Sequence, residues 1–416
     1  MSSDAPEHAR SLPPRPNLRH LKNQARDLQK AGQTASLADA QHQLARDYGF
    51  ASWPKLKAHV ESLTEIGQLR DAIDTNDLAR VQELMTRNPE LHRAPLGYHD
   101  NGPLTWVAEC RVPREAPSEA RLEIARWMIA NGSDVHQGGD GPLMRAALED
   151  ERLPMLELLV EHGADVNAEW DGRYPIILAP CETLQPQTLR RLIELGADMH
   201  VASPEFGSGV QMLIGTYWRN PEGKHGCLEV FADAGFPFPD TAPMAVHRGR
   251  IDLLEQCLAR EPDLLNRRFR ESEIYPAELG LKGGLHVAPV EGTTLLHIAV
   301  EYHETDVAAW LLDRGADPNA RAAVDADGFG GHTPLFHTTV TLRLKEDALA
   351  RLLLRRGADP NARATFRKQL DYDPDPEAAT MREYLGVTSI GFAREFPLPE
   401  WVNEAAIAAI REAGGE

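Results

Sequence analysis

Apolar residues recur along most of the chain at the spacing of an α-helix. Clear stripes run over residues 307–312 and 349–354, and each is followed closely by a glycine, Gly315 or Gly357. Side chains three and four positions apart lie on one face of a helix, so each stripe predicts a short helix with one buried face. Aromatic residues make up only 6% of the chain, which favours helices over sheet. The pattern therefore predicts an all-α protein of many short helices.

The glycines after these stripes belong to a repeated tag, Gly-Ala-Asp-x-Asn or Gly-Ala-Asp-x-His. The tag begins at Gly163, Gly196, Gly315 and Gly357, and a near copy begins at Gly132. The first three tags in the chain are spaced by 31 and 33 residues, whereas the last two are 42 apart. Glycine just past a helix end can take the left-handed conformation that other residues disfavour. A period of this length indicates stacked repeats, and the wider spacing indicates an insertion.

The opening half of the repeat is clearest in residues 292–299, which read Gly-Thr-Thr-Leu-Leu-His-Ile-Ala. A second copy begins at Gly331, where Thr333 is expected to cap a helix whose first residue is Pro334. With its closing tag, the unit 292–319 resembles the ankyrin-repeat family. The resemblance extends roughly over residues 65–416. It implies a solenoid of helix-turn-helix units with hairpin loops, and a role in binding other proteins.

The repeat pattern also predicts how the chain is divided. We expect about nine units over residues 64–416, with residues 388–415 as a C-terminal cap. Insertions are expected near residues 111–120, 267–290, 322–330 and 364–386. The glycines of the second insertion favour an exposed excursion, and the Asp and Pro residues of the last favour a mobile loop.

The N-terminal part of the chain differs from the repeats. Residues 1–16 are polar and proline-containing, so we expect a disordered lead-in, not a secretory signal. Apolar spacing in residues 17–63 predicts three short helices, with Gly32 and Gly49 as stops and Pro54 near the start of the third. This segment resembles a helical module that precedes repeats in many bacterial ankyrin proteins, which implies a bacterial source.

Charge separates the N-terminal module from the body of the chain. The net charge is −19 overall, but residues 1–63 hold 9 basic against 6 acidic residues. The acidic body repels phosphate backbones, so nucleic acid could be contacted only by the module. A nucleic-acid-associated regulator is therefore our second hypothesis, although the small basic excess favours a simple N-terminal cap of the repeat stack.

Catalytic signatures do not emerge from the sequence. It has no nucleophile elbow, phosphate loop or dinucleotide fingerprint, so we expect no enzyme, no cofactor and no metal. A third hypothesis, an unrecognised hydrolase-type or metal site, rests on a polar set between the seventh and eighth units. Its members are His297, Tyr302, His303, Glu304, Asp325, Asp327, Phe329, His332 and His337. In the family resembled, however, the position of His297 serves hydrogen bonds of the repeat framework.

The leading hypothesis is an interaction scaffold that holds a protein partner in its concave groove and at its hairpin tips. The acidic body favours a partner with a basic surface. The contact residues that we expect at exposed finger and groove positions are Trp170, Asp171, Arg173, Tyr174, Tyr302, His303, Asp327 and Phe329. Four separated cysteines and the lack of a long apolar run predict a cytoplasmic protein outside the membrane.

Overall fold

The protein is described by a computed structural model that covers residues 12–13, 16–62, 64–96, 101–112, 114–281, 284–368 and 381–416. Most of the predicted lead-in and the centre of the last insertion lie outside these residues. The chain divides into two compact units. Unit 1 consists of Met1–Ala146 and Glu151–Ala164, and unit 2 of Ala147–Asp150 and Asp165–Glu416.

Unit 1 is built from short helices. They are α1 (Leu18–Lys30), α2 (Leu37–Asp47), α3 (Trp53–Ser62), α4 (Glu65–Asp74), α5 (Leu78–Arg87), η1 (Pro89–Arg93), α6 (Pro103–Glu109), α7 (Glu119–Ala130), α8 (Gln137–Ala146) and α9 (Leu153–Glu161), with the turn η3 (Asp150–Arg152) at the sequence boundary of the units. Each of α1 and α2 starts at a polar cap, since Asn17 Oδ1 accepts from Arg19 N at 2.8 Å and Ser36 Oγ from Asp39 N at 3.1 Å.

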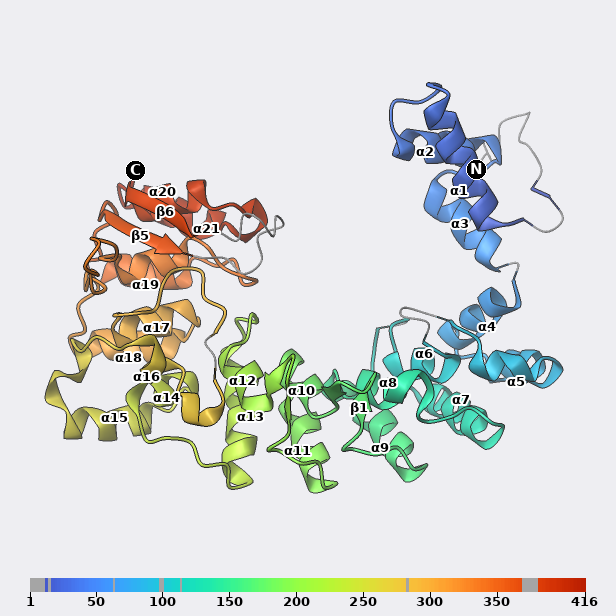
Figure 1. Cartoon of the computed structure of the whole chain (residues 1–416), viewed down its shortest axis with the longest axis horizontal. Coiled ribbons are helices and arrows are strands. Elements are labelled where there is room, and N and C mark those ends of the chain that lie inside the picture. The colour runs from blue at the N-terminus through green and yellow to red at the C-terminus, as the bar shows by residue number, and fades with distance from the viewer. Residues whose placement is uncertain are drawn as a thin grey trace. The chain divides into compact units, whose positions relative to one another are not determined.

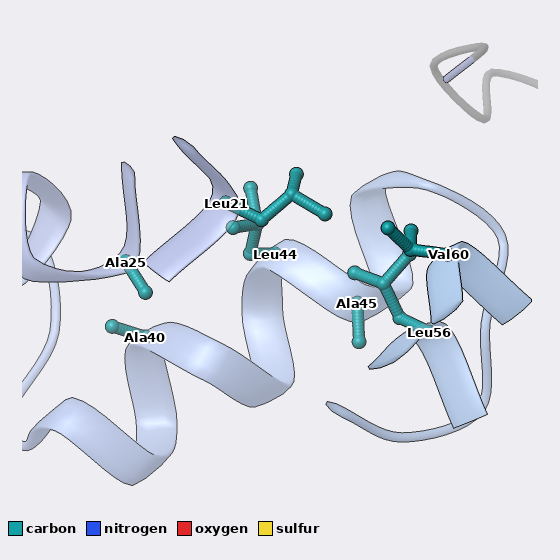
Figure 2. Close-up of a cluster of buried hydrophobic side chains, with 7 residues drawn as sticks. All are labelled: Leu21, Ala25, Ala40, Leu44, Ala45, Leu56 and Val60. Carbon is teal, nitrogen blue, oxygen red and sulfur yellow. The ribbon is translucent and has the colours of Figure 1, made fainter. Parts of the chain in front are cut away.

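The first three helices surround their own buried cluster, which Figure 2 shows in close-up. Its members are Leu21, Ala25, Ala40, Leu44, Ala45, Leu56 and Val60. The predicted stops are also present, because Gly32 and Gly49 take φ values of +69° and +83° after α1 and α2. The prediction of three short helices in this segment is therefore confirmed.

Unit 2 continues the helical pairs and adds short hairpins (Figure 1). Its helices are α10 (Leu178–Thr183), α11 (Pro186–Glu194), α12 (Gly209–Ile214), α13 (Pro221–Asp233), α14 (Ala242–His247), α15 (Ile251–Arg260), η4 (Pro262–Leu265), α16 (Glu271–Ile274), η5 (Ala277–Leu279), α17 (Leu295–Glu301), α18 (Thr305–Asp313), η6 (Pro334–Thr338), α19 (Ala348–Arg355), α20 (Ser389–Glu395), η8 (Pro399–Trp401) and α21 (Glu404–Glu412). Its strands form three antiparallel pairs: β1 (Glu169–Trp170) with β2 (Tyr174–Pro175), β3 (Ala202–Ser203) with β4 (Gly207–Ser208), and β5 (Ala364–Lys368) with β6 (Arg382–Val387). The core lies along the first helix of each pair, and every residue of α17 is buried.

The repeated tag has two structural roles in unit 2. Gly315 and Gly357 follow α18 and α19 with φ values of +95° and +90°, as predicted. The tag's asparagine then joins one turn to the next. Asn319 Nδ2 donates to Gly357 O at 2.8 Å, and Asn319 Oδ1 accepts from Asp359 N at 2.7 Å. Asn361 makes the same two kinds of bond further along the chain. The side chain of each asparagine therefore bonds to the backbone of the next repeat.

Two expectations about insertions were wrong. Residues 267–290 are not an exposed excursion, since Phe269, Ile274, Tyr275 and Val290 are all buried. The ends of the 364–386 insertion are not loop either, because they form β5 and β6. These strands are built by aromatic packing: Phe366 pairs with Tyr384 across the strands, and both rings lie about 5 Å from that of Phe392. Because this hairpin is small, the fold is still that of an all-α solenoid.

Candidate functional site

The 267–290 insertion covers the inner helices of unit 2 where an open concave groove was expected. Its Tyr275 ring lies 6.0 Å from that of His247 on α14, and its hydroxyl is hydrogen-bonded to Tyr302, directly after α17. Further along, Leu285 N donates to Gly215 O at 3.2 Å. The insertion therefore joins the ends of α12, α14 and α17, and this part of the inner surface is occupied by the chain itself.

Buried charges lie beneath the insertion. Glu301 Oε1 accepts from Arg219 Nη2 at 2.8 Å and from Val287 N at 3.1 Å, while its Oε2 lies 2.7 Å from His337 Nδ1. Burial acts to raise the pKa of Glu301, but the His337 hydrogen bond and the Arg219 charge outweigh it and lower the pKa to about 2. Glu301 is therefore a buried carboxylate whose two oxygens both have hydrogen-bond partners. Such an arrangement stabilises the fold and leaves no oxygen of Glu301 without a partner.

A second buried carboxylate repeats this arrangement one turn further on. Glu304 pairs through Oε1 with Lys224 Nζ and lies 2.8 Å through Oε2 from His225 Nε2. Burial lowers the pKa of Lys224, and the facing carboxylate opposes that shift. Both basic residues come from α13, so the pair ties that helix to the turn after α17.

Three histidines of the polar set, His297, His332 and His337, lie with their ring centres 5.3–5.7 Å apart, but their ring nitrogens bond to different partners. His297 Nδ1 lies 2.9 Å from Thr294 Oγ1 and its Nε2 lies 3.2 Å from His332 O, which confirms the framework role expected for this residue. His332 Nε2 lies 2.9 Å from Pro289 O, whereas His337 faces Glu301. Within the described residues no group of three or more His, Cys, Asp or Glu side chains is arranged to hold a metal ion.

Three of the expected contact residues are buried, contrary to the expectation that they are exposed. Tyr302 and Tyr174 are 2% and 6% exposed, and His303 is 9% exposed. Tyr302 is covered by the 267–290 insertion, and His303 Nε2 lies 3.3 Å from Thr341 Oγ1. Their burial follows from segments distant in sequence, which no local pattern at these positions indicates.

The remaining expected residues Trp170, Asp171 and Arg173 lie on the β1–β2 hairpin, where the aromatic rings of two hairpins form a row. Trp170, on β1, lies with its ring 6.4 Å from that of Tyr174, and Tyr174 lies 5.1 Å from Phe206 in the next hairpin. Exposed Arg173 Nη1 lies 3.1 Å from Glu205 Oε2, which links the same two hairpins, and Asp171 is exposed at the turn. We call Trp170, Tyr174 and Phe206 the finger row.

Asp327 and Phe329 lie on a separate finger, within the 322–330 insertion. Asp325 Oδ1 accepts from the backbone N of Asp327 and of Phe329 at 3.0 and 2.9 Å, which fixes the finger's turn. Arg367 of β5 reaches both carboxylates and stacks 4.6 Å from the centre of the Phe329 ring. Gly330 N donates to Thr365 O at 2.6 Å, so the finger lies alongside β5.

A groove of about 360 Å³ opens beside this finger, and we call it the finger groove. Its lining residues are Pro289, Glu291, Ala323, Val324, Asp325, Phe329, Gly330, His332, Phe366, Arg367 and Met381. Five large apolar side chains are exposed in the described part of the chain, and two of them, Val324 and Met381, line this groove. A third, Leu385, is 65% exposed on β6, which pairs with β5.

Met381 and Leu385 are not among the contact residues that the sequence predicts, since the pattern of residues 364–386 predicts a loop. The available signal was the placement of Thr365-Phe366 and Tyr384 on either side of a run rich in Asp and Pro, which is typical of two strands joined by a turn.

The N-terminal module carries basic side chains on one face. Arg19, Lys22, Arg26 and Lys30 are all exposed on α1 and lie three or four positions apart. The opposite face of α1 is buried through Leu21 and Ala25. The described part of the chain has no helix long and apolar enough to cross a bilayer.

Comparison with known proteins identifies the repeated helical pairs. The family model for the ankyrin repeat matches residues 138–170 and 291–323. Human "Ankyrin repeat and SOCS box protein 6" is 31% identical over 144 residues, which is 32% of this chain and 33% of that protein, and its counterpart from Pongo abelii matches to the same extent. The chain thus spans about a third of the length of the curated relatives it matches. The chain contains ankyrin repeats, and these matches indicate no catalytic family.

Proposed function

We propose that this chain is a non-catalytic interaction protein that binds a protein partner in the finger groove. The observation that carries the proposal is that two exposed apolar side chains, Val324 and Met381, line one hollow, whereas most other large apolar side chains in the described part of the chain are buried. Exposed apolar groups that cluster around a concavity are typical of an interaction site.

The residue types around the groove support this use. Phe329, Met381 and Arg367 are of the kinds that contribute most to protein interfaces. Arg367 is paired with Asp325 and Asp327, and the carboxylate of Glu291 also lines the groove, so the rim is polar and acidic. The complementary element is an apolar side chain of the partner, inserted between the finger and β5.

The charge of unit 2 suggests the wider character of the partner. Residues 165–416 hold 25 Lys and Arg against 39 Asp and Glu. An acidic surface accelerates encounter with a basic one, so we propose a partner with a basic surface. The four cysteines are buried and unpaired, which supports a cytoplasmic location, and the likeness of residues 17–63 to a module of bacterial proteins supports a bacterial source.

The test compares a groove variant with a matched control. Met381→Asp places one charge at the groove, and Val112→Asp places one on an apolar side chain that is 44% exposed elsewhere. A partner recovered with the full wild-type chain is purified, and its Kd is measured for each form. We expect at least a tenfold weaker Kd for the groove variant and an unchanged Kd for Val112→Asp. Equal affinity of all three forms would contradict the proposal.

A second candidate function is nucleic-acid binding by the N-terminal module, supported by the basic face of α1. The full chain is titrated with duplex DNA at two salt concentrations, next to a variant with Arg19, Arg26 and Lys30 changed to Gln. Binding that weakens with salt and is lost in the variant would support this function. Absence of binding at low salt would end it.

A further inference from the structure

Two consecutive aromatic residues in unit 2 hold an arginine from a distant turn. Tyr217 and Trp218 lie between α12 and α13, are partly buried, and have ring centres 5.5 Å apart at an angle of 31°. The guanidinium carbon of Arg343, in the turn between η6 and α19, lies 4.1 Å from the Trp218 ring centre and 5.3 Å from that of Tyr217. This pair of rings therefore accommodates a planar cation.

A carboxylate lies beside Tyr217. Glu182, on α10, accepts a hydrogen bond from the Tyr174 hydroxyl at 2.7 Å. Burial and, after it, the charge of Glu182 raise the pKa of Tyr217, so the carboxylate acts directly on that residue. Aromatic faces and an opposite charge together are what a cationic side chain needs from a binding site.

We propose that Tyr217, Trp218 and Glu182 form a binding site for an arginine side chain of a basic peptide segment, and that Arg343 occupies this site in the unbound chain. The site is separate from the finger groove, so this inference goes beyond the proposed function. Arginine is favoured over lysine because a guanidinium stacks flat on the rings and pairs with a carboxylate in one plane, whereas an ammonium is compact and strongly hydrated.

The surroundings suit a peptide more than a free amino acid. Tyr174, which donates a hydrogen bond to Glu182, also contacts the rings of Trp170 and Phe206 in the finger row. The excess of 39 acidic over 25 basic residues in positions 165–416 favours a basic segment there.

Arg343 is exposed, which makes it an occupant that is easily displaced. A cation over an aromatic ring at an exposed position changes an equilibrium by only about two- to fivefold. Removing Arg343 should therefore strengthen the binding of an added arginine by that factor, since the added group no longer competes with it.

The test uses the full chain with fluorinated tryptophan and follows the fluorine resonance of Trp218, assigned by its absence from Trp218→Phe. The probes are acetyl-Gly-Arg-Gly-amide and the same peptide with lysine or citrulline in place of arginine. We expect the resonance to shift on titration with the arginine peptide, with a Kd about two- to fivefold tighter in Arg343→Ala. The lysine peptide should bind more weakly, and citrulline, which is neutral, should bind least.

A matched control exists on the same unit. Arg314 also stacks 4.1 Å from a tryptophan ring centre, that of Trp310, so Arg314→Ala removes an equivalent contact elsewhere and should leave the titration unchanged. Glu182→Gln keeps the acceptor for Tyr174 but removes the charge, and should weaken arginine binding severalfold in a chain that still folds. Equal affinity of the wild-type chain and Arg343→Ala, or equal binding of arginine and citrulline peptides, would overturn the proposal. Neither outcome bears on the finger groove, which the Met381 variant tests by itself.

Discussion

Arg219 and Glu301 form a fully buried ion pair, although they are 82 positions apart in the sequence. The two side chains are 1% and 0% exposed, and Arg219 Nη2 lies 2.8 Å from Glu301 Oε1. The pair joins the turn after α12 to the end of α17, so it links helical pairs that are not consecutive. In a solenoid, where each repeat normally contacts only its neighbours, such a bond makes several repeats cooperate.

Removing one member of this pair should strongly destabilise unit 2. Arg219→Ala leaves the Glu301 carboxylate buried with one charge partner fewer, and breaking a buried pair in this way costs about 3–5 kcal/mol. Urea unfolding of the full chain, followed by hydrogen exchange in peptides from α12 and α17, measures the change. The control is Arg190→Ala, which removes an exposed pair with Asp233 and should cost no more than about 1 kcal/mol. Similar losses in both variants would contradict the structural role of the buried pair.

Acid should weaken unit 2 before its carboxylates begin to titrate. Burial lowers the pKa of His332 to about 3 and that of His303 to about 4, below the value of about 6.5 for an unfolded chain. The unfolded state therefore binds more protons below pH 6.5, so the stability is complete above that pH and falls as the pH drops toward 4. Each of these histidines should cost about 2 kcal/mol between pH 7.5 and pH 5.

The free energy of unfolding at these two pH values provides the measurement. His303 has a φ of +59°, and asparagine tolerates that left-handed conformation, so His303→Asn removes the titrating ring with little backbone strain. This variant should lose part of the pH dependence. An unchanged dependence would show that His303 does not contribute to it.

The asparagine bonds between tags should contribute measurably to the stability of the stack. Asn319→Ala removes both the donor to Gly357 O and the acceptor from Asp359 N, which should cost about 1–2 kcal/mol at this exposed position. Asn319→Asp keeps the acceptor alone and should lie between the wild-type chain and the alanine variant in its urea midpoint. A midpoint of Asn319→Ala equal to that of the wild-type chain would mean that the tag's asparagine is not a link between repeats.

Two left-handed glycines should differ in their tolerance of alanine. At Gly357, with φ of +90°, an added Cβ meets nothing within 4 Å, so Gly357→Ala should cost only the backbone strain of about 1–2 kcal/mol. At Gly292, with φ of +69°, the added atom would lie 2.5 Å from Ala323 Cβ, so Gly292→Ala adds a steric clash to the same strain. Thermal unfolding should show a lower Tm for Gly292→Ala, and the reverse order would contradict this reading of the two turns.

Patterns among residues close in the sequence predicted most of the fold. The Gly-Ala-Asp tags end helices because a left-handed residue is needed there, and His297 bonds to Thr294 three residues away. Both effects act over a few residues, so they can be read from the sequence. The same holds for Trp170, Tyr174 and their hairpin, although the burial of Tyr174 also depends on Phe206 in the next repeat.

The candidate site depended on contacts that no local pattern encodes. The sequence by itself determined the repeats and the three N-terminal helices. Only the tertiary structure decided that the 267–290 insertion folds back over α14 and α17, that Tyr302 and His303 are buried, and that Met381 lines a groove beside the finger. The physical reason is that backbone angles and helix caps are set by residues close in the sequence. Burial, in contrast, is set by contacts between residues far apart in the sequence, such as Gly215 and Leu285, which meet only in the folded chain.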